Sequence, residues 1–399
     1  MKNVIMLRSH YPDARLEKEA RSLIKSGYNV TLLVWDRGRI SEIQRSYACR
    51  VKRFKLAVSP DSLKVCFYLP IWWLYIIFQL AIEKWDSIHA ADFDTFAPAL
   101  IVARVTKKPI IYDIFDFYAD MIGFPIFPKI SRAFFASTDR FLIMFADAVI
   151  LPDDSRREQI GLSNNENIVT IVNAPSDKFS NNSVVSDSIS ENFTIFYGGG
   201  ISDDRGIDVM CKAVKTLSGV RLVIMGPCSE ACGVRLRSIC QNALSIELDL
   251  KWTPHEEIIR LAMNANILFA FYDPNIPNNK YASPNKLFEA MMCSKPILVN
   301  DNTNMAKIVR EEDCGLVVPY GDVDAIKHAI LTLKNEPTLC KRLGENGRKA
   351  YETKYSWEIM EERLLEIYRR LDPEQRETGA IAHSSSNILA PVVGEETSK

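Results

Sequence analysis

The amino-acid sequence predicts an α/β protein made of two domains, each built on a doubly wound parallel sheet. The chain has 399 residues, more than one ordinary hydrophobic core accommodates. Short apolar runs typical of buried strands alternate with stretches of helical periodicity in both halves. Between the halves, residues 176–192 are polar and rich in serine and asparagine, a composition typical of a linker.

The first half opens with a strand–helix–strand unit. NVIML at residues 3–7 and NVTLLV at residues 29–34 read as buried strands, and the apolar helical stripe between them ends at Gly27. The alternation returns in SIHA, PIIYD and DAVILP, so residues 1–175 form the predicted N-terminal domain. No Gly-x-Gly-x-x-Gly follows the first strand, which argues against a dinucleotide oxidoreductase.

The second half repeats the pattern over residues 193–355. Its predicted strands are FTIFY, RLVIM, IEL, ILFAF and PILV, with helical stretches between them. Residues 356–371 have the periodicity of a closing helix, whereas residues 372–399 have none and are predicted to be a disordered tail.

The amino-acid composition limits which binding partners and which cellular compartment are expected. Lysine and arginine number 49 against 50 acidic residues, so the chain has no polybasic character and nucleic acid is not an expected partner. Nine cysteines are scattered without the spacing of a zinc or redox motif, and we therefore expect no metal. With no secretory signal at the start, these features favour a reduced, cytoplasmic protein.

Two apolar segments of the first half suggest contact with a membrane surface. Residues 65–82 carry no charge, but Pro70 and the scattered aromatic side chains favour a helix lying in the membrane interface over one that spans the bilayer. Residues 124–145 mix apolar and basic side chains as an interfacial amphipathic helix does. The alternative is that both helices are buried in the first domain. Peripheral association with the cytoplasmic membrane face is expected, with Trp72, Trp73, Tyr75 and Phe78 as anchors.

The stretch YASPNKLFEAM combines a helix start with two opposite charges. Ser283 is expected to cap a helix that begins at Pro284. Lys286 in the first turn opposes the helix dipole unless an anion binds there, and Glu289 stands one turn further on. The alternative is a surface helix with a solvated Lys–Glu pair.

A second element is expected at the same edge of the second sheet. FTIFY runs into three glycines, residues 198–200, where a diphosphate can approach the backbone, and Arg205 follows. Parallel strands end at one edge, so this turn and the Lys286 helix are expected to converge on a nucleoside diphosphate. Glu289 would accept hydrogen bonds from ribose hydroxyls. Alone, three consecutive glycines are more often a plain turn.

Several segments resemble the GT-B glycosyltransferases of family four. The resemblance covers residues 3–371 and is carried by SPNKLFEAMMCSKPILV, GGGISDDRGID, CGLVVPYGDVDAIKHAI and PDARLEKEARSLIKSGYNVTLLV. It implies the GT-B fold, with two Rossmann-like domains facing across a cleft, and a closing helix that packs on the first domain. It also implies a retaining, metal-independent transfer that needs no cofactor beyond a UDP- or GDP-linked sugar donor.

The resemblance also implies roles for individual residues. Glu289 would bind ribose, and Arg205 and Lys286 would bind the diphosphate and stabilise it as it leaves. The implied donor site also includes Gly199, Gly200, Ser283 and Asn285.

At two positions the sequence departs from the family pattern. Tyr281 stands where many relatives have a glutamate that contacts the sugar, and Phe115 stands where they often have a histidine. Asp116 becomes the candidate for contact with the acceptor hydroxyl or the sugar, and its alternative role is to cap a strand end. His10 and Asp92 are further acceptor-side candidates, whereas His89 is expected to be a satisfied core histidine.

The predicted function is hexosyl transfer from a nucleotide sugar to a glycan or lipid-linked acceptor in polysaccharide biosynthesis. One alternative is a GT-B sugar-nucleotide epimerase, which needs acid–base groups facing the hexose, and the chain is poor in them. Another is a non-catalytic donor-binding subunit of a membrane glycan assembly, which Tyr281 and Phe115 favour.

Overall fold

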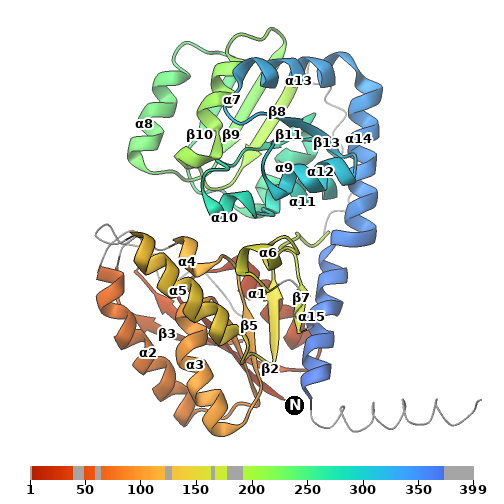
Figure 1. Ribbon diagram of the computed structural model, residues 1–399. Helices are drawn as coiled ribbons and strands as arrows, with labels where there is room; N and C mark the ends of the chain where they lie inside the picture. The colour runs from red at the N-terminus through yellow and green to blue at the C-terminus, as the bar shows by residue number, and fades with distance from the viewer. Residues whose placement is uncertain are drawn as a thin grey trace, which may run out of the picture. The chain divides into compact units, whose positions relative to one another are not determined.

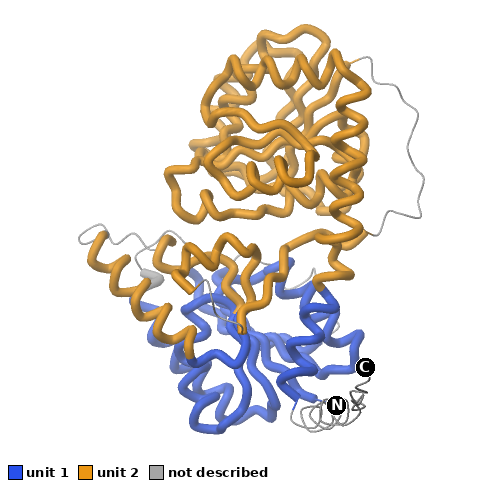
Figure 2. Tube along the Cα trace, turned by 45° about the vertical axis from the view of Figure 1, so that its right-hand side comes forward, with its two compact units in different colours: residues 1–112, 145–149, 361–399 blue, residues 113–144, 150–360 orange. Residues whose placement is uncertain are grey.

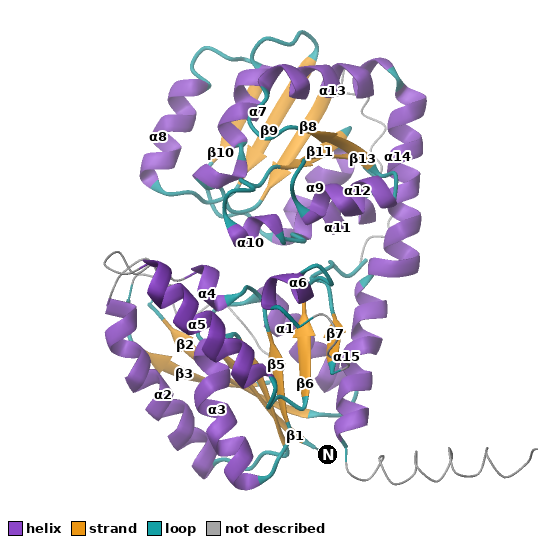
Figure 3. Cartoon of the chain, viewed as in Figure 1, coloured by secondary structure: helices purple, strands orange, loops and turns teal. Residues whose placement is uncertain are grey.

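The computed structural model describes residues 2–38, 49–58, 64–121, 128–162, 167–177 and 192–372. It contains two sheets with helices on both faces, as Figure 1 and Figure 3 show. Most of the predicted linker, residues 178–191, and the predicted tail from residue 373 onward lie outside the described residues. The predicted domain boundaries therefore stay predictions.

The first sheet has seven strands in the order β3-β2-β1-β4-β5-β6-β7. β1 pairs in parallel with both β2 and β4, and its residues from Val4 to Leu7 are buried because helices cover both faces. The strands are β1 (Asn3–Arg8), β2 (Asn29–Asp36), β3 (Arg50–Lys55), β4 (Ser87–Ala91), β5 (Ile110–Asp113), β6 (Ala148–Leu151) and β7 (Ile168–Thr170). The first helices are α1 (Ala14–Lys25), α2 (Lys64–Ile82), α3 (Phe93–Thr106), α4 (Tyr118–Met121), α5 (Pro128–Ile143) and α6 (Arg156–Ile160).

The second sheet has six strands in the order β10-β9-β8-β11-β12-β13, and every neighbouring pair is parallel. The order turns back at β8, so the connections from β8 and from β11 leave in opposite directions. The strands are β8 (Phe193–Gly198), β9 (Val220–Met225), β10 (Ile246–Asp249), β11 (Ile267–Ala270), β12 (Ile297–Asn300) and β13 (Gly315–Val318). The predicted pair of doubly wound parallel sheets is confirmed.

Helices cover both faces of the second sheet: α7 and α13 lie over one face, and α9, α11 and α12 over the other (Figure 3). The helices are α7 (Ile207–Val214), α8 (Glu230–Ile239), α9 (His255–Asn264), α10 (Pro277–Lys280), α11 (Asn285–Met292), α12 (Asn304–Glu311), α13 (Val323–Asn335), α14 (Pro337–Ala350) and α15 (Trp357–Leu371). Short helical turns span Asp203–Arg205 and Tyr351–Tyr355.

The chain divides into two compact units, coloured in Figure 2. Unit 1 comprises residues 1–112, 145–149 and 361–399, and unit 2 comprises residues 113–144 and 150–360. The whole second sheet, together with α4, α5 and α6, belongs to unit 2.

Helix α2 corrects the prediction of membrane anchors. Trp72 is fully buried, with ring centroids 5.8 Å from Trp35 and 5.6 Å from Phe54. Trp72 is therefore wrong as a predicted anchor. Trp73 is half-buried and donates its ring N–H to the carbonyl of Asp94 at 3.0 Å, and its role as an anchor stays a prediction. The alternative of a wholly buried helix is also wrong, because a different row of α2 is exposed, consisting of Phe67, Ile71, Leu74, Phe78 and Ile82. Within the described residues, no helix combines the length and the apolar character that crossing a bilayer requires.

Candidate functional site

The candidate site lies where the second sheet reverses its strand order. β8 ends at Gly198, and the neighbouring β11 ends at Ala270, so the segments that follow them leave this edge on opposite sides. Ligands of open parallel sheets bind in the crevice that such a reversal creates. The glycine turn and the segment leading to α11 both start here, as the sequence predicts.

The glycine turn contacts Lys286 directly. A β-carbon placed on Gly199 would lie 2.8 Å from Lys286 Nζ, so the ammonium sits against the bare backbone of the turn. The same nitrogen lies 4.7 Å from the centre of the Tyr197 ring, and the Tyr197 hydroxyl donates to the Gly200 carbonyl at 2.7 Å. Burial lowers the pKa of Lys286 below its usual value. The structure thus holds a partly desolvated cation beside the turn.

Arg205 is held by stacking and hydrogen bonding. Its guanidinium carbon lies 3.7 Å from the centre of the Tyr272 ring, and Nη1 donates to Asn279 Oδ1 at 3.3 Å. Asn279 in turn donates to Asp204 Oδ2 at 2.9 Å, and Arg205 Nε lies 3.5 Å from that carboxylate. Because five N–H donors belong to a guanidinium, these contacts leave donors for an anion.

Glu289 makes a contact that the sequence analysis did not anticipate. Its carboxylate is buried, and Oε1 lies 2.8 Å from Nε2 of His255, an exposed residue at the start of α9. The alternative of a solvated Lys–Glu pair is wrong, since Glu289 is buried and Lys286 is half-buried. The other carboxylate oxygen, Oε2, takes no part in the His255 contact and is the candidate acceptor for ribose hydroxyls.

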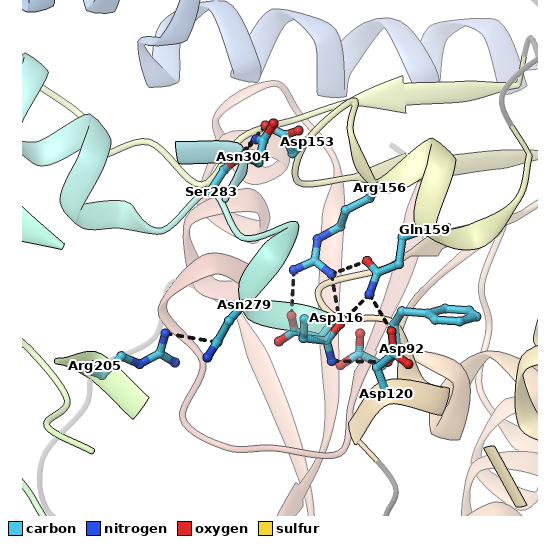
Figure 4. A network of polar contacts seen from close by, with 12 residues as sticks. Asp92, Asp116, Asp120, Asp153, Arg156, Gln159, Arg205, Asn279, Ser283 and Asn304 are labelled. Carbon is cyan, nitrogen blue, oxygen red and sulfur yellow. Dashed lines mark hydrogen bonds and ion pairs between the residues drawn. The ribbon is translucent and has the colours of Figure 1, made fainter. Parts of the chain in front are cut away.

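Ser283 does not cap α11. Pro284 is the residue before the helix, with φ −72° and ψ 154°, and the helix begins at Asn285 without a side-chain cap. The Ser283 hydroxyl instead donates to Asp153 Oδ2 at 2.5 Å and accepts from Asn304 Nδ2 at 2.9 Å (Figure 4). These two hydrogen bonds occupy the hydroxyl that was expected to cap the helix, and they fix the chain before α11. Asn285 is half-buried in the first turn.

Asp116 is engaged by an arginine that the sequence analysis missed. Arg156 is 3% exposed and donates from Nη2 to Asp116 Oδ1 at 2.7 Å. Its Nη1 also donates to Gln159 Oε1 at 2.9 Å and Asn278 Oδ1 at 3.2 Å. Asn278 neighbours Asn279, so helix α10 joins the Asp116 network to Arg205, as Figure 4 shows. Asp116 lies beyond the end of β5 and keeps 46% of its side chain exposed.

The acceptor-side candidates of unit 1 differ in their surroundings. Asp92 has φ 64° and is 5% exposed, and it forms an ion pair with Arg8, which also bonds Asp13 Oδ2 at 2.8 Å. Burial by itself lowers the pKa of Arg8, yet the two carboxylates raise it overall, so Asp92 is a buried ion-pair partner. The acceptor-side role of Asp92 stays a prediction, and in the structure its carboxylate is engaged by Arg8. His10 is half-buried after β1.

His89 is a satisfied core histidine, as expected. It is fully buried in β4, and Nδ1 lies 2.9 Å from the hydroxyl of Tyr368 in α15. Nε2 lies 3.5 Å from Glu19 Oε2.

One sequence signal would have found the missed residues. Arg156 follows the apolar strand β6, and His255 follows β10, so both lie just beyond the carboxyl end of a parallel strand. Functional polar side chains of α/β proteins gather at that edge. Asn279 carries no comparable signal, because its partner Arg205 is far away in sequence.

Two doubly wound parallel sheets with a cationic site beside a glycine turn define a protein of the GT-B class.

Comparison with known proteins leads to the same class. Residues 179–350 match the family model described as glycosyl transferases group 1. The capsular polysaccharide biosynthesis glycosyltransferase CapM of Staphylococcus aureus is 25% identical over 295 residues, which cover 67% of this chain and 72% of that protein. Residues 179–350 therefore carry a glycosyl transferases group 1 domain, and the protein is a glycosyltransferase.

Solved structures share the fold over nearly the whole chain. Sucrose-phosphate synthase from Thermosynechococcus elongatus superposes with a TM-score of 0.74 at 16% identity, covering 93% of this chain and 99% of that one. Anabaena Alr3699/HepE in complex with UDP-glucose superposes with a TM-score of 0.71 at 14% identity, covering 92% and 99%. At such identities the likeness establishes the GT-B fold alone.

Proposed function

We propose that this glycosyltransferase moves a hexose from a nucleoside-diphosphate sugar to a glycan or lipid-linked acceptor. The observation that carries the proposal is the placement of Lys286 against Gly199 at the strand-order reversal, with Arg205 following the same turn. Uridine is the first donor base to test, because the structural neighbour HepE was solved with UDP and with UDP-glucose. Guanosine is the second.

Lys286 and Arg205 are suited to stabilise the nucleoside diphosphate as it leaves the sugar. When the bond from the anomeric carbon to the diphosphate breaks, negative charge grows on the leaving phosphate oxygen. Lys286, whose burial lowers its pKa, and the stacked guanidinium of Arg205 would stabilise that charge without reorganising. We propose a metal-independent transfer on this basis. Retention of anomeric configuration is proposed from the family resemblance, with the leaving phosphate taking the acceptor proton.

Asp116 is proposed to act on the acceptor side. Its carboxylate is 46% exposed, and the hydrogen bond from Arg156 to Oδ1 fixes the direction of the group. His10 stays a proposed acceptor contact, and Ser283 is proposed to position the start of α11 rather than to touch the donor.

The two alternatives are less well supported. The epimerase needs paired acid–base groups, whereas the nearest such groups found here are already bound: Glu289 by His255 and Asp116 by Arg156. The group 1 family match and the glycosyltransferase names of the relatives also favour transfer over an epimerase or a scaffold.

We further propose peripheral membrane association through the exposed row of α2. Phe67, Leu74 and Phe78 are 78%, 68% and 58% exposed, and they recur at helical spacing with Ile71 and Ile82. A continuous apolar row of this kind is costly in water and is typical of an interface. The acceptor would then be lipid-linked or membrane-borne, in a polysaccharide pathway.

The test is a donor panel. Purified protein is incubated with UDP- and GDP-hexoses and a membrane-lipid extract, and release of free nucleoside diphosphate is measured. We expect extract-dependent release that falls at least about tenfold in Arg205→Ala and in Lys286→Ala, because each removes a charge-assisted contact. Lys307→Ala, whose side chain is 68% exposed on α12, is the matched control. Donor binding without turnover would instead support the scaffold, and an epimerised sugar would support the epimerase.

A further inference from the structure

Unit 2 contains a cavity whose lining includes none of the proposed donor ligands Lys286, Arg205 and Glu289. It has a volume of about 520 Å³ and is bounded by α4, α5, α6 and the segment around α10. Tyr281, which departs from the family pattern, forms part of its wall. Because the phenol ring carries no charge, this wall adds no negative charge to the cavity. The polar lining residues are Asp120, Lys129, Arg132, Arg140, Glu158 and Gln159.

Helix α5 presents two different rows along its length. Lys129, Arg132 and Arg140 line the cavity together with Ala133 and Ala136. Consecutive helical residues are turned by about 100°, so the residues that follow these positions form a neighbouring row. That row is apolar and exposed, with Ile130 at 70%, Phe134 at 64% and Phe141 at 55%. A cationic cavity wall and an open apolar strip therefore run side by side.

The cations differ in how firmly they are held. Arg132 Nη2 lies 2.5 Å from Asp120 Oδ1. The other oxygen of Asp120 accepts from Gln159 Nε2 at 2.8 Å (Figure 4). Arg140 donates from Nε to the Ile160 carbonyl at 2.8 Å, which anchors it at the end of α6. Both guanidiniums are thus fixed in position and keep further N–H donors.

Lys129 is the most available of these cations. It is exposed, and it forms no ion pair or hydrogen bond with any other described residue. Two of the lining residues are acidic, Asp120 and Glu158, against three cations. Asp120 is paired with Arg132, and Glu158 is exposed. The cavity thus has room, fixed N–H donors and one free ammonium beside an apolar strip.

We infer that this cavity binds the phosphate or diphosphate of an acceptor whose saccharide is carried on an apolar chain. Lys129 and the two arginines bind the phosphate oxygens, and the chain lies along Ile130, Phe134 and Phe141. This inference rests on the proposed function, because it names the class of acceptor. A phospholipid headgroup shares the same chemistry, an anionic phosphate beside apolar chains, and the experiment separates the two sources.

The probe is farnesyl diphosphate, which joins a diphosphate to an apolar chain. Binding to the full chain is measured by titration calorimetry with saturating UDP present, so that the donor site is filled. Lys129→Ala is expected to weaken binding about tenfold, because it removes one charge-assisted contact. Ala133→Trp is expected to abolish binding, since an exposed cavity-lining alanine is replaced by a side chain that fills the space. The matched control is Lys349→Ala, an exposed lysine on α14.

The outcomes are distinct. The inference is supported if binding is about tenfold weaker in Lys129→Ala and lost in Ala133→Trp, and if farnesol and inorganic diphosphate each bind far more weakly than farnesyl diphosphate. Unchanged binding in Lys129→Ala and Ala133→Trp overturns it. Equal binding of inorganic diphosphate also overturns it, because the apolar strip would then contribute nothing. If Lys129→Ala reduces binding only to phosphatidylglycerol vesicles, the site is a membrane contact and the inference fails. Nucleotide binding that persists in the variants shows a folded donor site, whereas failure of the proposed function would appear as absent binding of both UDP and GDP in the wild type.

Discussion

Replacing Gly199 by alanine tests whether the glycine turn and Lys286 act together. Gly199 has φ +124°, a conformation that residues with a side chain rarely adopt. The new methyl group would lie 2.8 Å from Lys286 Nζ and 3.5 Å from Cε, so the lysine must move. The substitution therefore strains the backbone and displaces the proposed phosphate ligand at once.

The two effects have separate magnitudes. Holding a residue with a side chain in a rarely populated backbone region costs about 1–3 kcal/mol, which lowers the free energy of unfolding. A lost hydrogen bond from a charged group costs about 1.5–3 kcal/mol, and each 1.4 kcal/mol is about tenfold in affinity. UDP affinity is therefore expected to fall about 10- to 100-fold.

Gly219→Ala is the matched control for this experiment. Gly219 also has a positive φ, +66°, and a methyl group there would lie 2.8 Å from another lysine nitrogen, Lys334 Nζ. It precedes β9, at the opposite end of the strands from the glycine turn. Unfolding is followed by calorimetry and UDP binding by titration calorimetry. The control is expected to lose stability and keep UDP affinity.

Two results would contradict this reasoning. If Gly199→Ala binds UDP as tightly as the wild type, Lys286 beside the turn is not a phosphate ligand. If Gly219→Ala weakens UDP binding equally, the loss reflects general destabilisation rather than the site.

Three further predictions concern other parts of the molecule. Burial lowers the pKa of Lys286 in the folded state below 10.5. Between the folded-state pKa and 10.5 the unfolded chain therefore binds more protons than the folded one, and the free energy of unfolding rises with pH. We expect Lys286→Met to melt at a higher temperature than the wild type at pH 7, with a difference in melting temperature that narrows toward pH 10.5. A constant gap would contradict this. Arg156→Met removes the hydrogen bond between Arg156 and Asp116. The variant should lower the free energy of unfolding by about 2 kcal/mol and reduce turnover without changing UDP affinity, which unfolding, rate and binding assays check. Weaker UDP binding would argue against an acceptor-side role. Leu74→Asp should reduce vesicle binding about tenfold in flotation assays without lowering the melting temperature, because the Leu74 side chain is 68% exposed. The control is Val234→Asp on α8, where the side chain is 61% exposed. Equal loss of vesicle binding in both variants would refute the role of the exposed α2 row in membrane binding.

The sequence predicted the fold and the convergence of two phosphate-oriented elements because both depend on local patterns. Apolar strand runs alternate with helical periodicity, and the carboxyl ends of parallel strands must share one edge. From that rule alone, the glycines after β8 and Lys286 at the start of α11 were expected together, and they are in contact.

The sequence could not predict the contacts that depend on tertiary packing. Nothing local pairs Glu289 with His255, which lies 34 residues earlier, or Asp116 with Arg156, which lies 40 residues later. Trp72 is buried against Trp35 although its own helix is apolar on every side, so periodicity gives no preferred face. Ser283 has the type of a cap, but Asp153 and Asn304 compete for its hydroxyl.

Gly226 shapes the glycine turn from a position behind it. A β-carbon on Gly226 would lie 2.0 Å from the Gly199 carbonyl oxygen, so the backbones after β8 and β9 pass each other with no room for a methyl group. At Gly200, in contrast, a β-carbon would have no neighbour within 4 Å, and Ser202 is exposed. Laboratory evolution of sugar preference should therefore leave residues 199 and 226 untouched and place its diversity at residues 200 and 202, where new side chains fit without moving the frame that carries the lysine.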